Sequence, residues 1–178
     1  KMKDEALNCF KIYKAEVENQ LEKKIKHLRS DRGGEYVSHE FAEFCAEHGI
    51  IHEVTPPYSP QSNGVAERKN RTLTDLVNAM LDSAGLAKSW WGEAALAACY
   101  VLNRVPSSKG DTTPHEGWKG HKPTLHFLRA WGYLAKVNVP VCKKRKLGPK
   151  TVDCIFLGYA HNSNAYKLLV VKSEFSDV

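Results

Sequence analysis

The sequence predicts an α/β fold followed by a small β module. Helix-like and strand-like segments alternate over residues 3–54, a long amphipathic helix follows, and short β-like runs fill about the last 50 residues. The 178 residues, of which 42% are hydrophobic, are enough to bury a core. The sequence contains no run of about 18 apolar residues and no apolar stretch of a secretory signal, so a soluble intracellular protein is expected.

The first third of the chain alternates helix and strand. Apolar positions recur with a helical period over residues 3–22, and residues 25–30 form a short strand that ends in the turn SDRGGEY. Ser38 is a candidate N-cap for the next helix, and Gly49 ends that helix. Residues 50–54, IIHEV, are a second strand.

A loop with three prolines, PPYSPQSNG, precedes a long helix that begins at Asn63 and Gly64 and ends near Ala84. Its apolar side consists of Leu73, Leu76, Val77, Met80 and Leu81. At about 100° per residue, a polar stripe on a different side consists of Glu67, Arg71, Thr74 and Asn78. Taken alone, Glu67 is an ordinary acid in a first helical turn, where it complements unpaired N–H groups.

A further helix spans roughly residues 89–104, and its tryptophans, leucines and alanines predict that it is largely buried. The turn-rich residues after it suggest a linker, and the segments WGYLAKVNVPV, TVDCIFLGYA and AYKLLVV are β-like. We therefore expect an α/β domain over residues 1–105, a linker over 106–124 and a β module over 125–178.

The positive charge is concentrated in one segment. The net charge is +6, and residues 117–152 contain nine Lys or Arg and no Asp or Glu. Such a segment suits a polyanion, most simply nucleic acid. The run KKRK within it consists of Lys143, Lys144, Arg145 and Lys146, and taken alone it is equally well explained as a solvated loop or a nuclear-import signal.

The five cysteines are odd in number and widely spaced, which argues against a disulfide framework or a zinc site. We expect them to be reduced and mostly buried, and we assign no structural metal.

Two carboxylates are candidates for a shared site. Asp31 follows the strand at residues 25–30, and 35 residues separate it from Glu67. In α/β proteins polar sites gather at the carboxyl ends of strands. The interval holds one helix, one strand and a loop, which can bring the start of the long helix back beside the first strand.

The segments around these carboxylates carry a resemblance to a known family. HLRSDRGGEY, followed at this spacing by TPPYSPQSNGVAERKNRTL, resembles the second aspartate and the glutamate of the D,D-35-E integrases, in particular copia-type LTR-retrotransposon integrases. The segments WWGEAALAACYVLNRVPS, TTPHEGWKGHKPTLHFLRAWGYLAKV and KLGPKTVDCIFLGY continue the resemblance in the family's order, so it covers essentially the whole chain.

The resemblance implies a ribonuclease-H-like core followed by an SH3-like module, and a metal-dependent enzyme that trims the 3′ ends of element DNA and joins them to target DNA. Three carboxylates would hold two Mg²⁺ or Mn²⁺ ions, with Asp31 and Glu67 as catalytic metal ligands. The DNA-binding positions it suggests are Tyr58, Asn63, Arg68, Lys69 and Arg71, besides the basic run. It also implies homo-oligomers on paired DNA ends and a nuclear location.

One part of the family pattern is not found. The first catalytic aspartate and the zinc module lie upstream of the helix with which this sequence begins, and Asp4 falls in a predicted helix rather than a strand. We therefore expect a truncated or decayed integrase with weakened metal binding and impaired activity. The alternatives are a non-catalytic nucleic-acid-binding remnant or domesticated protein, which needs neither carboxylate, and an interaction module anchored by Trp90 and Trp91.

Overall fold

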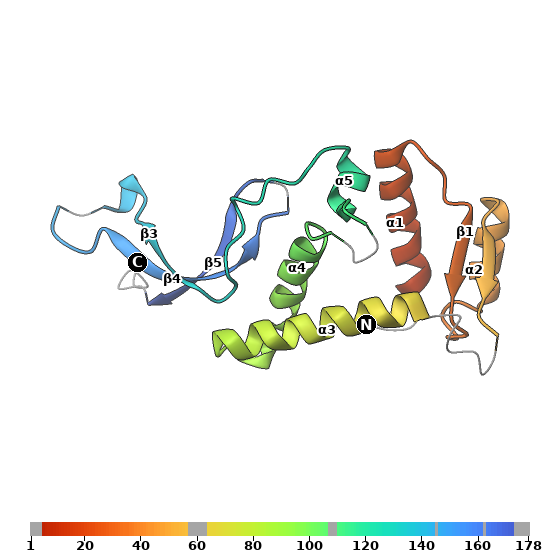
Figure 1. The fold of residues 1–178 in the computed structure, drawn as a ribbon, viewed down its shortest axis with the longest axis horizontal. Helices are drawn as coiled ribbons and strands as arrows, with labels where there is room; N and C mark the ends of the chain where they lie inside the picture. Colours follow the sequence, from red (N-terminus) through yellow and green to blue (C-terminus); the bar gives the residue numbers. More distant parts are fainter. Residues whose placement is uncertain (1–4, 57–63, 107–109, 145, 162, 173–178) are drawn as a thin grey trace. The chain divides into compact units, whose positions relative to one another are not determined.

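The computed structural model describes residues 5–56, 64–106, 110–144, 146–161 and 163–172 (Figure 1). The chain divides into two compact units, residues 1–69 and 70–178, with the boundary inside one long helix. The domain bounds expected at residues 105 and 125 stay a prediction. Among the described helices, none is both long and apolar enough to cross a membrane.

The first unit contains the alternating helices and strands that the sequence predicts. In chain order they are α1 (Ala6–Leu21), β1 (His27–Ser30), α2 (His39–Glu47) and β2 (Ile51–Val54) (Figure 1). The two strands are parallel, with His27 opposite Ile51 and Ser30 opposite Val54, and α2 forms the connection between them. Within the described residues this sheet has two strands.

The ends of α2 follow from local chemistry. The Ser38 hydroxyl accepts a hydrogen bond from the Phe41 N–H (3.3 Å), as expected of an N-cap. Gly49 follows the helix with φ of 63°, a conformation that glycine adopts without a steric penalty. The predicted cap and the predicted end are both confirmed.

Aromatic side chains build the core of the first unit. Phe41 of α2 is fully buried, and the Phe10 ring of α1 stacks on it with 5.5 Å between centroids. Cys45 and Ile50 complete the buried cluster, and Leu28 of β1 packs against it. The helices therefore cover the face of the sheet that carries Leu28, and α1 is joined to β1 through this core.

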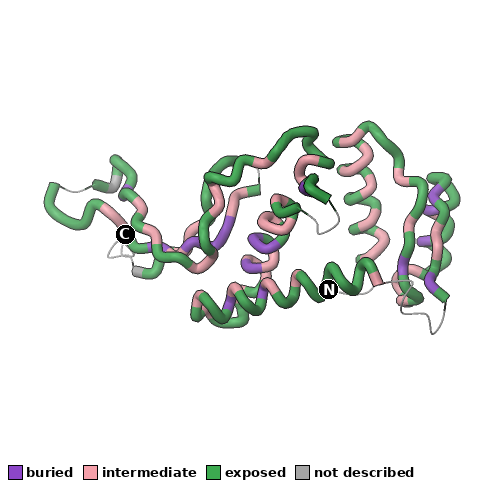
Figure 2. Tube along the Cα trace, in the orientation of Figure 1, coloured by how far each residue is buried: buried purple, intermediate pink, exposed green. Residues whose placement is uncertain are grey.

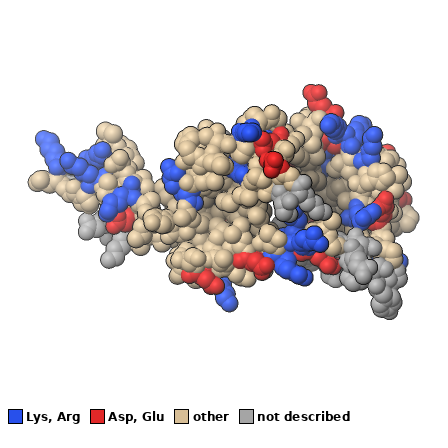
Figure 3. All heavy atoms as spheres, viewed as in Figure 1, with Lys and Arg blue, Asp and Glu red and all other residues tan. Residues whose placement is uncertain are grey.

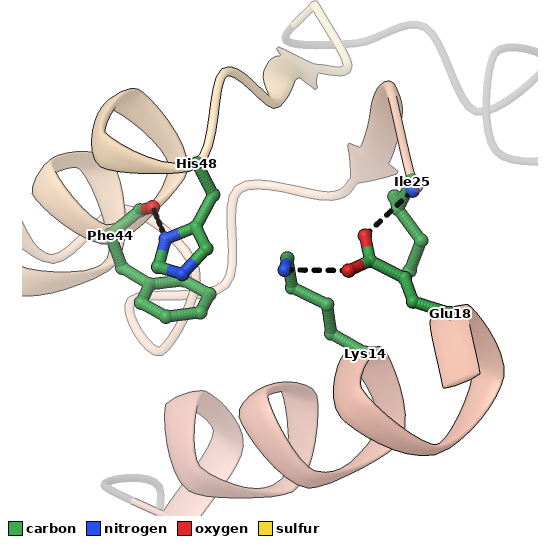
Figure 4. Close-up of polar contacts among 5 residues, drawn as sticks. All are labelled: Lys14, Glu18, Ile25, Phe44 and His48. Carbon is green, nitrogen blue, oxygen red and sulfur yellow. Dashed lines mark hydrogen bonds and ion pairs between the residues drawn. The ribbon is translucent and has the colours of Figure 1, made fainter. Parts of the chain in front are cut away.

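A carboxylate also fixes the connection from α1 to β1. Glu18 accepts a hydrogen bond from the Lys14 ammonium (2.9 Å) and another from the backbone N–H of Ile25 (2.8 Å), just before β1 (Figure 4). The Lys14 hydrogen bond, assisted by that of Ile25, lowers the pKa of Glu18. At the far end of α2, His48 lies 2.9 Å from the Phe44 carbonyl oxygen (Figure 4).

The long helix α3 (Gly64–Ala84) confirms the predicted division into an apolar and a polar side. Val77 and Leu81 are buried in a cluster with Ala94 and Ala98, and Leu73, Leu76 and Met80 pack against it. The polar stripe that begins at Glu67 is exposed along its length.

The next helix is less buried than the sequence predicted. A 3-10 turn at Lys88–Trp90 leads into α4 (Trp91–Leu102), in which Trp91 and Leu96 are each 65% exposed. The residues buried on α4 are instead alanines, whose small side chains let the helix approach α3 and the β sheet closely (Figure 2). The expectation of a largely buried helix was therefore wrong for Trp91 and Leu96.

A short helix lies within the expected linker. This helix, α5 (Pro114–Lys119), begins with a capping box in which Thr113 and Glu116 exchange hydrogen bonds between side chain and backbone. Proline at the first helical position suits such a start, since its missing N–H would be unpaired there in any case. The expected linker is thus partly helical.

The C-terminal strands form a three-stranded antiparallel sheet in the order β3-β4-β5, as expected for the SH3-like module. They are β3 (Leu134–Asn138), β4 (Thr151–Tyr159) and β5 (Tyr166–Lys172). A 3-10 turn at Val141–Lys143 lies in the connection between β3 and β4.

Helices and sheet share contacts within the second unit. The Tyr100 ring of α4 stacks on Tyr159 of β4, with 3.7 Å between centroids and 14° between planes. Lys167 of β5 places its ammonium 2.7 Å from both carboxylate oxygens of Glu93 on α4. The sheet is therefore docked on α4 through both aromatic and ionic contacts.

Candidate active site

Asp31 lies directly after β1, where a tight turn holds its side chain. The side chain is exposed, and Oδ1 accepts a hydrogen bond from the Gly33 N–H (3.1 Å). The turn closes through the Tyr36 N–H, which donates to the Gly33 carbonyl (2.9 Å). From the described residues the carboxylate receives no ion pair, and its second oxygen receives no hydrogen bond, so that oxygen can face a ligand.

Ser30 supports Asp31 from within the sheet, a feature that the sequence reasoning missed. Its side chain is buried, and Oγ lies 2.9 Å from the Asp31 carbonyl oxygen and 2.9 Å from Nε2 of His52 on β2. The Ser30 carbonyl also accepts a hydrogen bond from the Thr55 N–H (3.0 Å). The end of β1 is therefore fixed to the end of β2 through backbone and side chain together.

Glu67 lies in the first turn of α3 and is exposed. It forms no ion pair with any described residue. Over the described part of the chain, no three His, Cys, Asp or Glu side chains are grouped so that they could hold a metal ion. The pairing of Asp31 with Glu67 at a metal therefore stays a prediction.

The predicted DNA-binding residues fall into two groups. On α3, Arg68, Lys69 and Arg71 are exposed. In the β3–β4 connection Lys144 and Lys146 are exposed, and Figure 3 shows Lys and Arg atoms gathered at this end of the second unit. Tyr58, Asn63 and Arg145 lie outside the described residues, as does the side chain of Lys143.

An aromatic pocket of about 460 Å³ lies beside the hairpin between β4 and β5 and was not foreseen from the sequence. Tyr100, Tyr159 and Tyr166 line it, and the Arg104 guanidinium lies 3.3 Å from the centroid of the Tyr100 ring. The Arg129 N–H donates to the Tyr159 hydroxyl (3.1 Å), yet burial dominates and raises the pKa of Tyr159. Spacing could not reveal this pocket, because its members come from α4 and two strands.

The cysteines and tryptophans differ in part from the expectation. All five cysteines are free, but Cys9, Cys99 and Cys142 are exposed and two are buried, so the expectation of mostly buried thiols was wrong. Trp90 packs against the α3–α4 cluster, whereas Trp91 is exposed.

Comparison with known proteins supplies the class. Residues 1–60 match the integrase core domain family, and residues 133–174 match the retroviral polymerase SH3-like domain family. A solved simian T-cell lymphotropic virus intasome, in complex with the PP2A regulatory subunit B56 gamma, aligns over 97% of this chain and 63% of its own, with a TM-score of 0.53 and 18% identity. The fold is thus that of an integrase, a ribonuclease-H-like core with an SH3-like module.

The curated relatives narrow the class. The Retrovirus-related Pol polyprotein from transposon TNT 1-94 of Nicotiana tabacum is 44% identical over 169 residues, which is 94% of this chain and 13% of the relative. The corresponding polyprotein from transposon RE2 of Arabidopsis thaliana is 32% identical over 170 residues, 95% of this chain and 12% of the relative. The chain therefore spans about an eighth of these relatives' length.

The chain is thus similar over nearly its whole length to the Pol polyproteins of copia-type retrotransposons, as the sequence resemblance predicted. These matches support a partial integrase and do not favour the alternative of a non-catalytic binding remnant.

Proposed function

We propose that this segment serves a metal-dependent polynucleotidyl transferase that trims the 3′ ends of element DNA and joins them to target DNA. The observation that carries the proposal is the placement of Asp31. Its exposed carboxylate ends a parallel strand within the matched integrase core and is oriented by the Gly33 N–H, with one oxygen left for a ligand. Glu67, separated from Asp31 by 35 residues, offers a second exposed carboxylate at a helix start.

The chemistry of these donors fits a divalent cation. Mg²⁺ and Mn²⁺ are hard ions that prefer carboxylate oxygens. Among the described residues, no basic side chain forms an ion pair with Asp31 or with Glu67. Such ions, when bound, supply activation of the attacking oxygen and stabilisation of the leaving oxygen in an in-line displacement at phosphorus. The part of this chain is to hold the two carboxylates in place, one on a strand end and one on a helix.

The basic residues supply a surface for the DNA backbone. Lys69 and Arg71 are exposed in the second turn of α3, and Lys144 and Lys146 are exposed in the β3–β4 connection. Exposed ammonium and guanidinium groups neutralise phosphates and release counterions, so binding should weaken with salt. Assembly as a homo-oligomer on paired DNA ends and a nuclear location, with KKRK as the import signal, complete the proposal.

Strand transfer with Mg²⁺ and with Mn²⁺ tests the proposal. The integrase that contains this segment would be compared with its Asp31→Asn and Glu67→Gln variants, and with Asp75→Asn, which removes another exposed carboxylate of α3. We expect each of the first two variants to lose at least about 100-fold in rate, and the Asp75 variant to keep its rate. The 178-residue chain, assayed beside them, is expected to bind DNA with poor turnover.

Undiminished transfer by either Asp31→Asn or Glu67→Gln would contradict the proposed metal site. Salt-sensitive DNA binding by all of these proteins, without transfer by any of them, would support the binding remnant instead.

A further inference from the structure

A chain of hydrogen bonds crosses the ends of β1 and β2 behind Asp31. Ser30 Oγ lies 2.9 Å from the Asp31 carbonyl oxygen and 2.9 Å from Nε2 of His52. A hydroxyl has one proton and a carbonyl oxygen can only accept, so the Ser30 proton goes to Asp31. His52 must then carry its proton on Nε2 and donate to Ser30 Oγ, an assignment that rests on the partners in this network.

His52 is fixed by the core of the first unit. Its ring lies 5.4 Å from the ring of Phe41, centroid to centroid. Phe41 is fully buried and also contacts the rings of Phe10 and Tyr36. Ser30 is itself 7% exposed, so water has little access to the bond between hydroxyl and imidazole. The donor is therefore held by a rigid element rather than by a loop.

Asp31 is consequently held from two sides. Its main-chain carbonyl accepts from Ser30, and its side chain accepts from the Gly33 N–H (3.1 Å). The strand end before it is fixed by the Thr55 N–H, and Arg32 after it donates to the Thr55 carbonyl (3.2 Å). A carboxylate with both its peptide and one oxygen fixed presents the other oxygen in a narrow range of directions.

We propose that His52 is a positioning residue for Asp31, acting through the Ser30 hydroxyl to aim the carboxylate at its metal. The inference rests on the proposed function, since it takes Asp31 to be a metal ligand. Outer partners of this kind commonly change metal affinity by about 10- to 100-fold. The role requires an N–H at the Nε2 position of residue 52 and a hydroxyl at residue 30, and it requires no change of protonation.

Matched variants separate positioning from general stability. His52→Leu removes the donor, whereas His52→Gln can place an N–H near the Nε2 position. Ser30→Ala removes the hydroxyl with little change of volume, whereas Ser30→Thr keeps it. His48→Gln is the control histidine, because His48 is exposed and bonds to the Phe44 carbonyl instead.

Two readouts do not depend on activity. In the integrase that contains this segment, labelled with ¹⁵N-glycine and free of metal, hydrogen exchange of the Gly33 amide reports the Asp31 side chain. Calorimetric titration with Mn²⁺ reports the metal site. We expect His52→Leu and Ser30→Ala to speed Gly33 exchange and to weaken Mn²⁺ binding about 10-fold. The His52→Gln, Ser30→Thr and His48→Gln variants should stay close to the unsubstituted protein in both readouts. In His52→Leu and Ser30→Ala, kcat for strand transfer should also fall, without a change in KM for DNA.

Each outcome decides something. Folded His52→Leu or Ser30→Ala protein with unchanged Gly33 exchange and Mn²⁺ affinity would overturn the inference, and if His52→Leu does not fold, Ser30→Ala alone decides. Failure of His52→Gln to restore what His52→Leu loses would also count against it. Asp31→Asn separates failure of the proposed function from failure of the inference about His52. If Asp31→Asn still binds Mn²⁺ normally, the proposed function fails. If Asp31→Asn loses Mn²⁺ binding but His52→Leu and Ser30→Ala keep it, only the role of His52 fails.

Discussion

Gly132, just before β3, lies against Ala84 at the end of α3. A Cβ atom at position 132 would collide with the Cβ of Ala84 and come within 3.2 Å of its Cα. Gly132 also has φ of 79°, and its N–H donates to the Phe156 carbonyl of β4 (2.8 Å). Helix end and sheet therefore meet at a position that only glycine can occupy without displacement.

The first prediction concerns that contact. Gly132→Ala should lower the free energy of unfolding by about 2 to 5 kcal/mol, because it adds a strained φ and a collision with a helix end. Urea unfolding of the 178-residue chain measures this loss. Gly120→Ala is the control, since Gly120 has a similar φ of 75° but open space at its Cβ, and it should lose about 1 kcal/mol. Equal losses of stability in the two variants would show that the structure relieves the collision with Ala84, and would contradict the prediction.

The second prediction concerns the stacked tyrosines. Tyr159→Ala should cost about 3 to 5 kcal/mol, because it removes a large ring that stacks on Tyr100. Tyr159→Phe keeps the stack and loses the hydroxyl that accepts from the Arg129 N–H, which should cost about 1 kcal/mol. Denaturant unfolding compares the two variants, and a similar cost for both would contradict a leading role for the stack.

The pKa of Tyr159 adds an alkaline signature. Burial raises this pKa above the ordinary value of 10.0, so the folded state holds the phenol proton more tightly than the unfolded state. The resulting stability is fully present below pH 10 and is lost as pH rises through the folded-state pKa. Unfolding midpoints measured above pH 10 should fall more steeply for the unchanged chain than for Tyr159→Phe. Parallel curves would contradict this prediction.

Acid should weaken the connection between α1 and β1. The Lys14 and Ile25 hydrogen bonds lower the pKa of Glu18 below 4.5, so the folded state binds this proton less tightly than the unfolded state. The stability from this group is present above pH 4.5 and is lost as pH falls through the lowered pKa. Glu18→Gln should therefore flatten the acid limb of the pH–stability curve, whereas Glu16→Gln, on the exposed side of the same helix, should leave it unchanged.

Salt dependence tests the basic connection between β3 and β4. Replacing Lys144 and Lys146 together with alanine should weaken DNA binding for all sequences and reduce the slope of log K against log salt by about 2. Fluorescence anisotropy at several salt concentrations measures this slope. Lys136→Ala is the matched control, because the Lys136 ammonium is paired with Asp153 at 2.6 Å and has less free charge to offer. Equal effects of both changes would contradict a specific role for the connection.

Local patterns predicted much of the fold because their causes are local. A serine cap at Ser38, a glycine after the helix and alternation in short strands act within a few residues, and the structure has each of them. The capping box at Thr113 and Glu116 is equally local, and the T-x-x-E pattern could have revealed α5. The surrounding prolines and glycines concealed it.

Other features depend on what packs against what. The exposure of Trp91 and Leu96 follows from the choice of alanines as the contact side of α4, which composition alone does not reveal. The site was anticipated only in part, since Asp31 and Glu67 are marked by spacing and resemblance. The bond between Ser30 and His52 depends on the register of two parallel strands.

The packing of the second unit bears on how such chains can be recombined. Val77 of α3 and Ala98 of α4 belong to the same hydrophobic cluster that Trp131, at the entrance to the β sheet, packs against. Breaking the chain between Leu102 and Trp131 would divide this cluster and leave apolar surface bare on both pieces. Transfer of the C-terminal module alone from one retroelement to another would therefore leave its apolar surface uncovered, unless its partner helices were transferred with it.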